Sequence, residues 1–195
     1  MKIGLYFGSF NPIHIGHLII GNYIANNTEV EQVWFVVSPQ NPLKKSSTLL
    51  NEYQRLHLVQ LATEGNSQLK VSDIEFKLPR PSYTIDTLTY LKEKYPLHQF
   101  SVIIGSDSLQ NIGKWKNSAL LLKDYSFYVY QRPGFIVKET SGNITLLKAP
   151  LLEISSTVIR ETIHAGKSIK YLVPDQVIEE IEKGNYYKKC SEQPG

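Results

Sequence analysis

Short apolar runs alternate along this chain with longer segments in which apolar residues recur every three or four positions. An apolar run bounded by turn residues is typical of a strand buried on both faces, and the wider spacing is typical of a helix that covers a sheet. The expected strands span residues 3–7, 33–37, 69–71, 74–76, 100–104, 125–130 and 144–147. The expected helices are one that opens with the apolar segment 18–20, then 51–62, 84–95, 157–164 and 175–182.

This alternation of strands and helices predicts the fold class. Strands separated by helices favour a parallel sheet covered by helices on both faces, which is an α/β architecture. The chain has no repeat, no low-complexity segment and no linker long enough to divide domains. We therefore expect a single domain over residues 1–187 and a flexible C-terminal tail over residues 188–195.

Composition narrows the classes of protein to which the chain can belong. Its 195 residues, of which 42% are hydrophobic, suit one domain with a real core. The net charge of +3 comes from interspersed acids and bases, so no nucleic-acid partner is expected, because a basic stripe is the usual footprint. No apolar stretch approaches the ~18 residues of a membrane span, and Met1 leads directly into the first expected strand. The single cysteine, Cys190, favours a reducing compartment, and we expect a cytoplasmic protein.

The most informative chemistry lies in residues 8–17, which read Gly-Ser-Phe-Asn-Pro-Ile-His-Ile-Gly-His. Gly8 would let the chain turn off the first strand, and Gly16 would let a ligand approach without meeting a Cβ. His14 and His17 lie three residues apart at a helix N-terminus, beside N–H groups without helical partners, which suits a polyphosphate. The alternatives are an ordinary loop with surface or core histidines, and a zinc site, which would need a third ligand that nothing nearby supplies.

A second segment, residues 154–160, reads Ile-Ser-Ser-Thr-Val-Ile-Arg at the start of an expected helix. Its hydroxyls can cap the helix or donate to phosphate, and Arg160 offers a planar, permanently charged fork for phosphate oxygens. Alone, the segment also suits simple capping beside a solvated arginine. Together with the H-x-G-H pattern of residues 14–17, it resembles the nucleotidylyltransferase superfamily. That resemblance implies a Rossmann-like, doubly wound, mainly parallel sheet in which the second motif closes over the phosphates of ATP.

A third segment, residues 105–107, reads Gly-Ser-Asp and follows an expected central strand. Ligands bind at the carboxyl ends of strands in such sheets, so this segment and residues 8–17 both lie where a nucleotide is expected. Asp107 can accept hydrogen bonds from ribose hydroxyls or cap the segment 108–110, and the two roles are compatible.

The rest of the chain is similar to the nicotinate mononucleotide adenylyltransferase family. The similar segments are 39–44, 73–75, 81–88, 105–107, 114–115, 131–134 and 173–187, which together span nearly the whole chain. The resemblance implies that the adenylyl group of ATP is transferred to nicotinate mononucleotide, giving nicotinate adenine dinucleotide and pyrophosphate in NAD biosynthesis. Attack on the α-phosphorus would be direct and in line, and Mg²⁺ would accompany ATP, held mainly by its oxygens and by water.

The resemblance also implies roles for individual residues. His14, His17 and Arg160 are expected to be catalytic. Trp115 is expected to stack on the pyridine ring, and Thr84 to direct its hydroxyl and neighbouring N–H groups at the ring carboxylate. The expected ATP-binding residues are Gly8, Ser9, Phe10, His14, Gly16, His17, Gly105, Asp107, Ile154, Ser155, Ser156, Thr157 and Arg160. The expected substrate-binding residues are Lys44, Ser82, Tyr83, Thr84, Trp115 and Arg132, and no protein metal ligand is expected. Lys44 and Arg132 are candidates for phosphate contacts.

Ser9 and Asn11 depart from the family, whose members commonly have Thr and Asp at these positions. Any role that requires a carboxylate at position 11 is therefore in doubt. The alternatives are sister enzymes acting on nicotinamide mononucleotide or phosphopantetheine, and a non-catalytic nucleotide sensor; a phosphopantetheine enzyme would not need the aromatic platform of Trp115. A nucleic-acid enzyme related to class I synthetases would need an anticodon-binding module, which the chain lacks. Tyr186 and Tyr187 could serve a homo-oligomer interface or pack the last helix.

Overall fold

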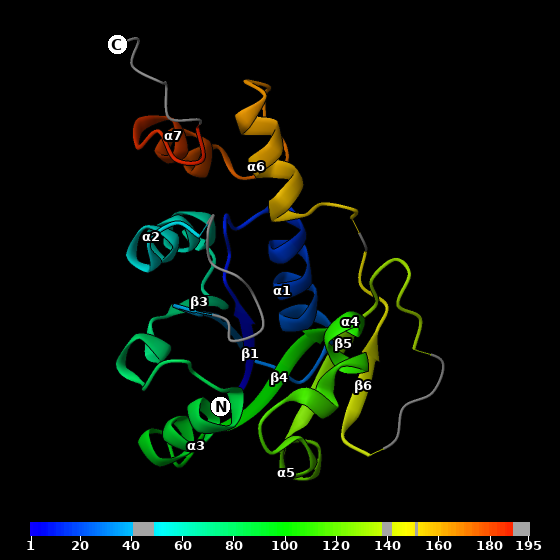
Figure 1. Ribbon diagram of the computed structural model, residues 1–195. Coiled ribbons are helices and arrows are strands. Elements are labelled where there is room, and N and C mark those ends of the chain that lie inside the picture. Colours follow the sequence, from blue (N-terminus) through cyan, green and yellow to red (C-terminus); the bar gives the residue numbers. More distant parts are fainter. Residues whose placement is uncertain (41–48, 138–141, 151, 189–195) are drawn as a thin grey trace.

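A parallel β-sheet forms the centre of the computed structural model, which describes residues 1–40, 49–137, 142–150 and 152–188 (Figure 1). Within these residues the sheet has six strands, in the order β3-β2-β1-β4-β5-β6, and every neighbouring pair is parallel. The strands are β1 Lys2–Gly8, β2 Gln32–Val37, β3 Leu69–Ser72, β4 Gln99–Gly105, β5 Ser126–Tyr130 and β6 Ile144–Leu147. The α-helices are α1 Ile15–Asn27, α2 Glu52–Thr63, α3 Thr84–Lys94, α4 Ser106–Gln110, α5 Ser118–Asp124, α6 Ser156–His164 and α7 Asp175–Lys183. Two 3₁₀ helices are η1 Ile74–Lys77 and η2 Ile112–Lys114.

The strand order confirms the expected Rossmann-like, doubly wound sheet. The chain runs outward from β1 to β3, then returns to the centre and runs outward again from β4 to β6. The direction of winding reverses between β1 and β4, and ligands of such sheets bind in the crevice outside the carboxyl ends of these two strands. The turns after β1 and β4 therefore occupy the expected binding edge.

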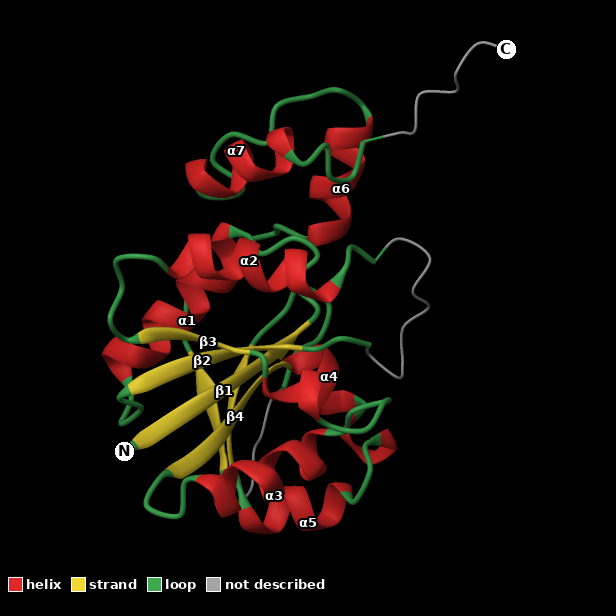
Figure 2. Ribbon diagram, turned by 90° about the vertical axis from the view of Figure 1, so that its left-hand side faces the viewer, coloured by secondary structure: helices red, strands yellow, loops and turns green. Residues whose placement is uncertain are grey.

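Each face of the sheet buries its own hydrophobic cluster of described side chains. Along β1, Tyr6 belongs to the cluster under α1 and α2, whereas Ile3 and Leu5 belong to the cluster under α3 and α5. Figure 2 shows the sheet between these two layers of helices. Alternation along the strand places successive side chains on opposite faces, and both faces are apolar because both are covered.

One expected strand is wrong: residues 74–76 form part of the 3₁₀ helix η1. The chain leaves the sheet at the end of β3, which is an edge strand. The buried side chain of Glu75 accepts hydrogen bonds from side chains there, and its backbone pairs with none of the described strands. The short helices α4 and α5 were not expected. Segments of five and seven residues are too short to show a helical spacing of apolar positions.

The C-terminal helices α6 and α7 lie beyond α1 and α2, on the same side of the sheet (Figures 1 and 2). The N–H of Ile15, the first residue of α1, donates to the carbonyl of Leu172 at 2.9 Å, and the hydroxyl of Tyr187 donates to Oδ1 of Asn11 at 2.9 Å. The last part of the chain is thereby bonded to the turn after β1. None of the helices in the described ranges combines the length and the apolar character needed to cross a membrane.

Candidate active site

The turn between β1 and α1 is shaped by Phe10 rather than by Gly8. Phe10 takes the left-handed backbone conformation, with φ of 44°, and its ring is buried. Gly8 does not have a positive φ, which corrects the expectation that it makes the sharp turn. A Cβ at Gly8 would lie 2.8 Å from the Phe10 ring, so glycine is required here because the ring packs directly on the strand end.

His14 and His17 face each other at the start of α1. Their rings are stacked, with centroids 3.6 Å apart and planes inclined by 25°, and the N–H of His14 donates to Nδ1 of His17 at 3.3 Å. The His17 ring also meets the edge of the Phe10 ring, at 5.1 Å between centroids, and that of Tyr6, at 5.9 Å. Aromatic packing from the turn and from β1 therefore holds the histidine pair in place at the helix N-terminus.

The environment of His14 favours the neutral imidazole. The side chain is 5% exposed, and Nδ1 makes no hydrogen bond to any described residue. Burial, together with the positive charge of Arg132, lowers the pKa of His14 from 6.5 to about 4. A buried, unpartnered ring nitrogen beside a helix N-terminus is suited to meet an anionic ligand, whose negative charge would favour the protonated form.

The segment 154–160 lies against this turn, although the two are far apart in the sequence. Ser155 caps α6 by accepting a hydrogen bond from the N–H of Val158 at 3.2 Å. The Ser156 hydroxyl donates to the Pro12 carbonyl at 2.8 Å, and Nη1 of Arg160 donates to the Asn11 carbonyl at 2.7 Å. The segment therefore caps its own helix, and it also brings Arg160 to the edge of the histidine turn, where the phosphate role stays a prediction. The remaining expected members of the segment are half-buried Ile154 and exposed Thr157, whose hydroxyl accepts from Arg160.

Asp107 and Arg132 meet beside the end of β4. Nε of Arg132 lies 3.5 Å from Oδ1 of Asp107, and Nη2 donates to the Tyr130 hydroxyl at 3.2 Å. The Tyr6 hydroxyl in turn donates to that of Tyr130 at 3.1 Å. Gly105 is needed for this approach, because a Cβ there would lie 2.4 Å from the Asp107 carboxylate and 3.0 Å from Nε of Arg132. The pair places one carboxylate and one cation at the binding edge.

The expected pyridine-binding residues gather at the start of α3. Tyr83 is the N-cap of α3, and Thr84 is its first residue, so the first N–H groups of the helix are free of intrahelical partners. Lys116 pairs with Asp86 in the first turn at 2.8 Å and lies 4.9 Å from the centre of the Tyr83 ring. These contacts tie the loop that carries half-buried Trp115 to the start of α3.

Ser82 differs from its neighbours in this loop. It is buried, and its hydroxyl donates to Oε2 of Glu75 at 2.9 Å. The side chain therefore points to the interior rather than to solvent. Lys44, the remaining expected contact, lies outside the described residues.

Arg55 and Asn11 are site-forming residues that the sequence did not reveal as such. Arg55 is fully buried and its guanidinium donates to backbone carbonyls of Ser9, Ser38, Pro39 and Leu50 at 2.6 to 3.1 Å. Oδ1 of Asn11 accepts from the Leu50 N–H at 3.2 Å as well as from Tyr187. Asn11 thus has a structural function that an amide oxygen can perform. The sequence signal for Arg55 is its spacing, because it precedes the apolar residues Leu58 and Val59 by three and four positions and so shares their helix face.

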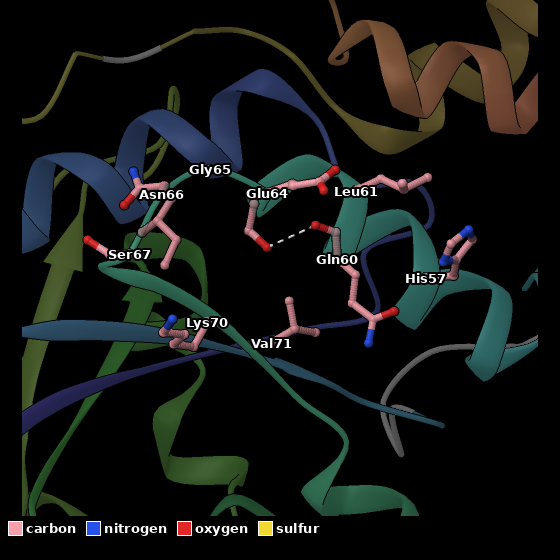
Figure 3. A pocket seen from close by; sticks show the side chains of 11 residues that line it. His57, Gln60, Leu61, Glu64, Gly65, Asn66, Ser67, Lys70 and Val71 are labelled. Atoms are coloured by element: carbon pink, nitrogen blue, oxygen red, sulfur yellow. Dashed lines mark hydrogen bonds between the residues drawn. The ribbon is translucent and has the colours of Figure 1, made fainter.

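A surface groove lies elsewhere, between α2 and β3 (Figure 3). His57, Gln60, Glu64 and Lys70 line it, and the Thr63 hydroxyl donates to the Gln60 carbonyl at 3.3 Å on its wall. It holds none of the motif residues, so the binding edge at β1 and β4 is the better candidate. Within the described ranges, no three His, Cys, Asp or Glu side chains gather closely enough to hold a metal ion.

Comparisons with known proteins agree on one family. The model of the cytidylyltransferase-like family matches residues 5–162. The chain is 54% identical to the probable nicotinate-nucleotide adenylyltransferase of Flavobacterium psychrophilum, over 97% of this chain and 100% of that protein. It is 53% identical to the protein of the same description from Cytophaga hutchinsonii, over 96% and 98%. Plasmodium falciparum nicotinic acid mononucleotide adenylyltransferase complexed with NaAD shares the fold, with a TM-score of 0.81 at 24% identity over 95% of this chain and 97% of that chain.

Proposed function

Because this chain belongs to the cytidylyltransferase-like family, and within it to the nicotinate-nucleotide adenylyltransferases, we propose that its β1–β4 edge joins ATP to nicotinate mononucleotide. The products are nicotinate adenine dinucleotide and pyrophosphate. The strongest structural support is the junction of two distant motifs: Ser156 and Arg160 bond directly to the backbone of the histidine turn. One edge of the sheet therefore presents a histidine pair, a helix N-terminus and an arginine to the same ligand.

In this reaction an oxygen of the mononucleotide phosphate attacks the α-phosphorus of ATP in line. The bond to that phosphorus forms as the bond from it to the bridging oxygen of pyrophosphate breaks, and no covalent intermediate with the protein is needed. Catalysis of this kind depends on positioning and on stabilising developing charge. MgATP is the substrate form, with the cation held mainly by phosphate oxygens and water.

The phosphate groups of ATP are assigned to the histidine turn and α6. His14 enters the reaction as a neutral imidazole, since burial keeps its pKa near 4. The negative charge of the bound phosphates favours protonation of the ring, which makes it a better hydrogen-bond donor. His17, stacked on it, faces the same ligand. Arg160 holds the β- and γ-phosphates and stabilises the departing pyrophosphate, while Asp107 lies at the end of β4, where ribose hydroxyls are expected.

The pyridine ring is assigned to the start of α3. Its carboxylate faces the N–H groups and hydroxyl at Thr84, where the helix dipole favours a negative charge. The ring stacks on Trp115, held in this region by the contacts of Lys116 with α3. Arg132, which lies beside Asp107, is assigned to the phosphate of the mononucleotide. This arrangement favours the acid over the amide, because an amide carries no charge for the helix dipole to bind.

A direct assay tests the proposal. The purified protein is mixed with MgATP and either nicotinate or nicotinamide mononucleotide, and pyrophosphate and dinucleotide are measured. We expect turnover with the acid and a clear preference over the amide. ATP binding without turnover of either would support the nucleotide sensor instead, and turnover of phosphopantetheine alone would support that sister enzyme.

Trp115→Ala separates the same alternatives. It should raise the KM for nicotinate mononucleotide about tenfold or more, given that an aromatic stack contributes about 1–3 kcal/mol. It should be nearly silent for phosphopantetheine. A cytoplasmic location, which the single cysteine favours, and a homo-oligomer complete the proposal. Tyr186 and Tyr187 pack against the cluster under α1 and α2, and their hydroxyls bond to Glu180 and Asn11, which favours the packing role of these two residues over an interface role.

A further inference from the structure

Glu75 is a buried carboxylate outside the reacting groups. Its side chain is 2% exposed, and its two oxygens accept hydrogen bonds from different parts of the next segment. Oε2 accepts from the Ser82 hydroxyl at 2.9 Å, and Oε1 accepts from the Thr87 hydroxyl at 3.0 Å. Thr87 is itself fully buried and lies one turn into α3. Glu75 therefore holds the residues on both sides of Tyr83 and Thr84.

The same carboxylate is linked to the phosphate side of the site. Ser38, directly after β2, also donates a side-chain hydrogen bond to Glu75. The Ser38 carbonyl accepts from Arg55, which also donates to the Ser9 carbonyl in the turn after β1. A continuous chain of polar contacts, buried at Arg55 and Glu75 and half-buried at Ser9 and Ser38, thus runs from the histidine turn to the start of α3.

Two features indicate that Glu75 does more than fill space. Burial of a carboxylate is costly and is maintained only where hydrogen bonds offset it, as the hydroxyls of Ser82 and Thr87 do here. Glu75 bonds to Ser82 and Thr87, which lie on either side of Thr84. The hydrophobic cluster under α3 consists of apolar side chains and does not need Glu75. The bonds therefore set the position of the first turn of α3 relative to the sheet.

We propose that Glu75 is a positioning residue for the acid-recognising start of α3, and that its bonds to Ser82 and Thr87 determine affinity for nicotinate mononucleotide and preference for the acid over the amide. The inference rests on the proposed function. Glu75 touches no substrate; it holds the N–H groups and hydroxyl at Thr84 in the geometry that a carboxylate requires. Loss of one of its bonds should therefore weaken binding of the mononucleotide and leave binding of ATP largely intact.

Thr87 offers a matched pair of variants for the test. Thr87→Val keeps the shape and removes the donor, and Thr87→Ser keeps the donor. We expect Thr87→Val to raise the KM for nicotinate mononucleotide about tenfold, to change the KM for ATP less than about twofold, and to narrow the preference for acid over amide. Thr87→Ser should remain within about twofold of the wild type. Thr89→Val is the control, because Thr89 lies on the same helix, is exposed and donates only to the Ile85 carbonyl at 2.9 Å.

Ser82→Ala provides a second route if Thr87→Val does not fold, as judged by thermal melting, and the same split between the two KM values is expected. Equal rises in both KM values, an unchanged KM for the mononucleotide, or equal losses in Thr87→Ser and Thr87→Val would overturn the inference. The wild-type control separates this result from the proposed function. A wild type that does not convert nicotinate mononucleotide contradicts the function itself. An active wild type whose variants have an unchanged KM for the mononucleotide contradicts only the role of Glu75.

Discussion

His14 shows how the chemistry of one residue is set by its place in the fold. The imidazole is buried against the turn after β1, and burial lowers its pKa to about 4. At neutral pH the site therefore offers a ring that is uncharged before ligand arrives. A nearby polyphosphate reverses this preference, because a negative charge within reach stabilises the imidazolium.

The pKa of His14 makes a prediction about acid stability. The unfolded chain takes up this proton near pH 6.5 and the folded chain only near pH 4, so the unfolded state binds more protons between those values. The free energy of unfolding should therefore decrease as the pH is lowered from 6.5 to 4, by up to about 3 kcal/mol. Urea unfolding at pH 7 and pH 4.5 measures the loss, which His14→Gln should lack.

Comparison with the His14→Gln variant isolates this effect. Burial raises the pKa of Glu75, so that group binds its proton more tightly when folded and acts in the opposite direction. Because Glu75 is present in both proteins, its contribution cancels in the difference. Equal pH dependence in the wild type and the variant would contradict the buried neutral state of His14. Titration of the imidazole by NMR, with and without ATP, should show the pKa of His14 rising in the complex.

Arg55 predicts a large effect on folding from a conservative change. Its buried guanidinium donates to four backbone carbonyls at once, and an ammonium on a flexible stem cannot reach all of them. Arg55→Lys should lower the free energy of unfolding by about 2–4 kcal/mol, because each buried acceptor left without a donor costs about 1–3 kcal/mol. Urea denaturation measures the change.

Arg80→Lys is the matched control for Arg55. Arg80 pairs with Glu52 at 2.8 Å while nearly half exposed, and exposed pairs contribute about 0–1 kcal/mol. The control should therefore unfold almost as the wild type does. If Arg55→Lys did the same, the buried guanidinium would not be holding the turn.

Among the helices and strands, α6 contributes the side chain of Arg160 to the candidate active site. Arg160 reaches the Asn11 carbonyl and the Thr157 hydroxyl, so its fork is already oriented at the edge of the histidine turn. Arg160→Ala should lower kcat on the order of 100-fold, the typical loss when one preorganised donor to developing charge is removed. Steady-state assay with saturating MgATP measures this, and Arg160→Lys should recover only part, because it lacks the planar fork.

Lys167→Ala is the control for Arg160. Lys167 is an exposed cation just beyond α6, so its removal changes the local charge equally. Activity should be unchanged. A similar loss in both variants would assign the effect to general charge rather than to the fork of Arg160.

The elements also show what the sequence could predict. Long apolar runs bounded by turn residues gave the strands from 3–7 to 144–147 nearly in place, because burial on both faces leaves a strong signal. The segment 74–76 failed because its apolar residues are buried by a 3₁₀ turn at the sheet edge. The motifs at 8–17 and 154–160 were predicted to meet, and they do. The partners of Arg55 and Glu75 could not be predicted, since they depend on side chains brought together from separate elements.

At the scale of the whole molecule, the two hydrophobic clusters share one sheet. Tyr6 and Leu5 are neighbours on β1 and belong to opposite clusters, so loss of either cluster exposes the other face of the same strand. We predict one cooperative unfolding transition for residues 1–187. Thermal melting followed by circular dichroism and by tryptophan fluorescence should give the same midpoint.

The two probes report on different parts of the molecule. Trp34 and Trp115 both pack against the cluster under α3 and α5, whereas circular dichroism also reports on α6 and α7. A transition seen by circular dichroism alone would mean that the C-terminal helices unfold independently. That outcome would contradict the single domain expected from the sequence.

The bond between Arg160 and the Asn11 carbonyl spans 149 residues of chain, and this separation determines when the two parts of the site become available during synthesis. Synthesis delivers the histidine turn first and α6 only near the end, at about 5–20 residues per second. An unfinished chain that lacks α6 and α7 has no Arg160, and it also lacks the C-terminal side chains that complete the cluster under α1 and α2. We therefore expect a chain that stalls before residue 160 to release no pyrophosphate from ATP, because the proposed site would be completed only in the last steps of translation.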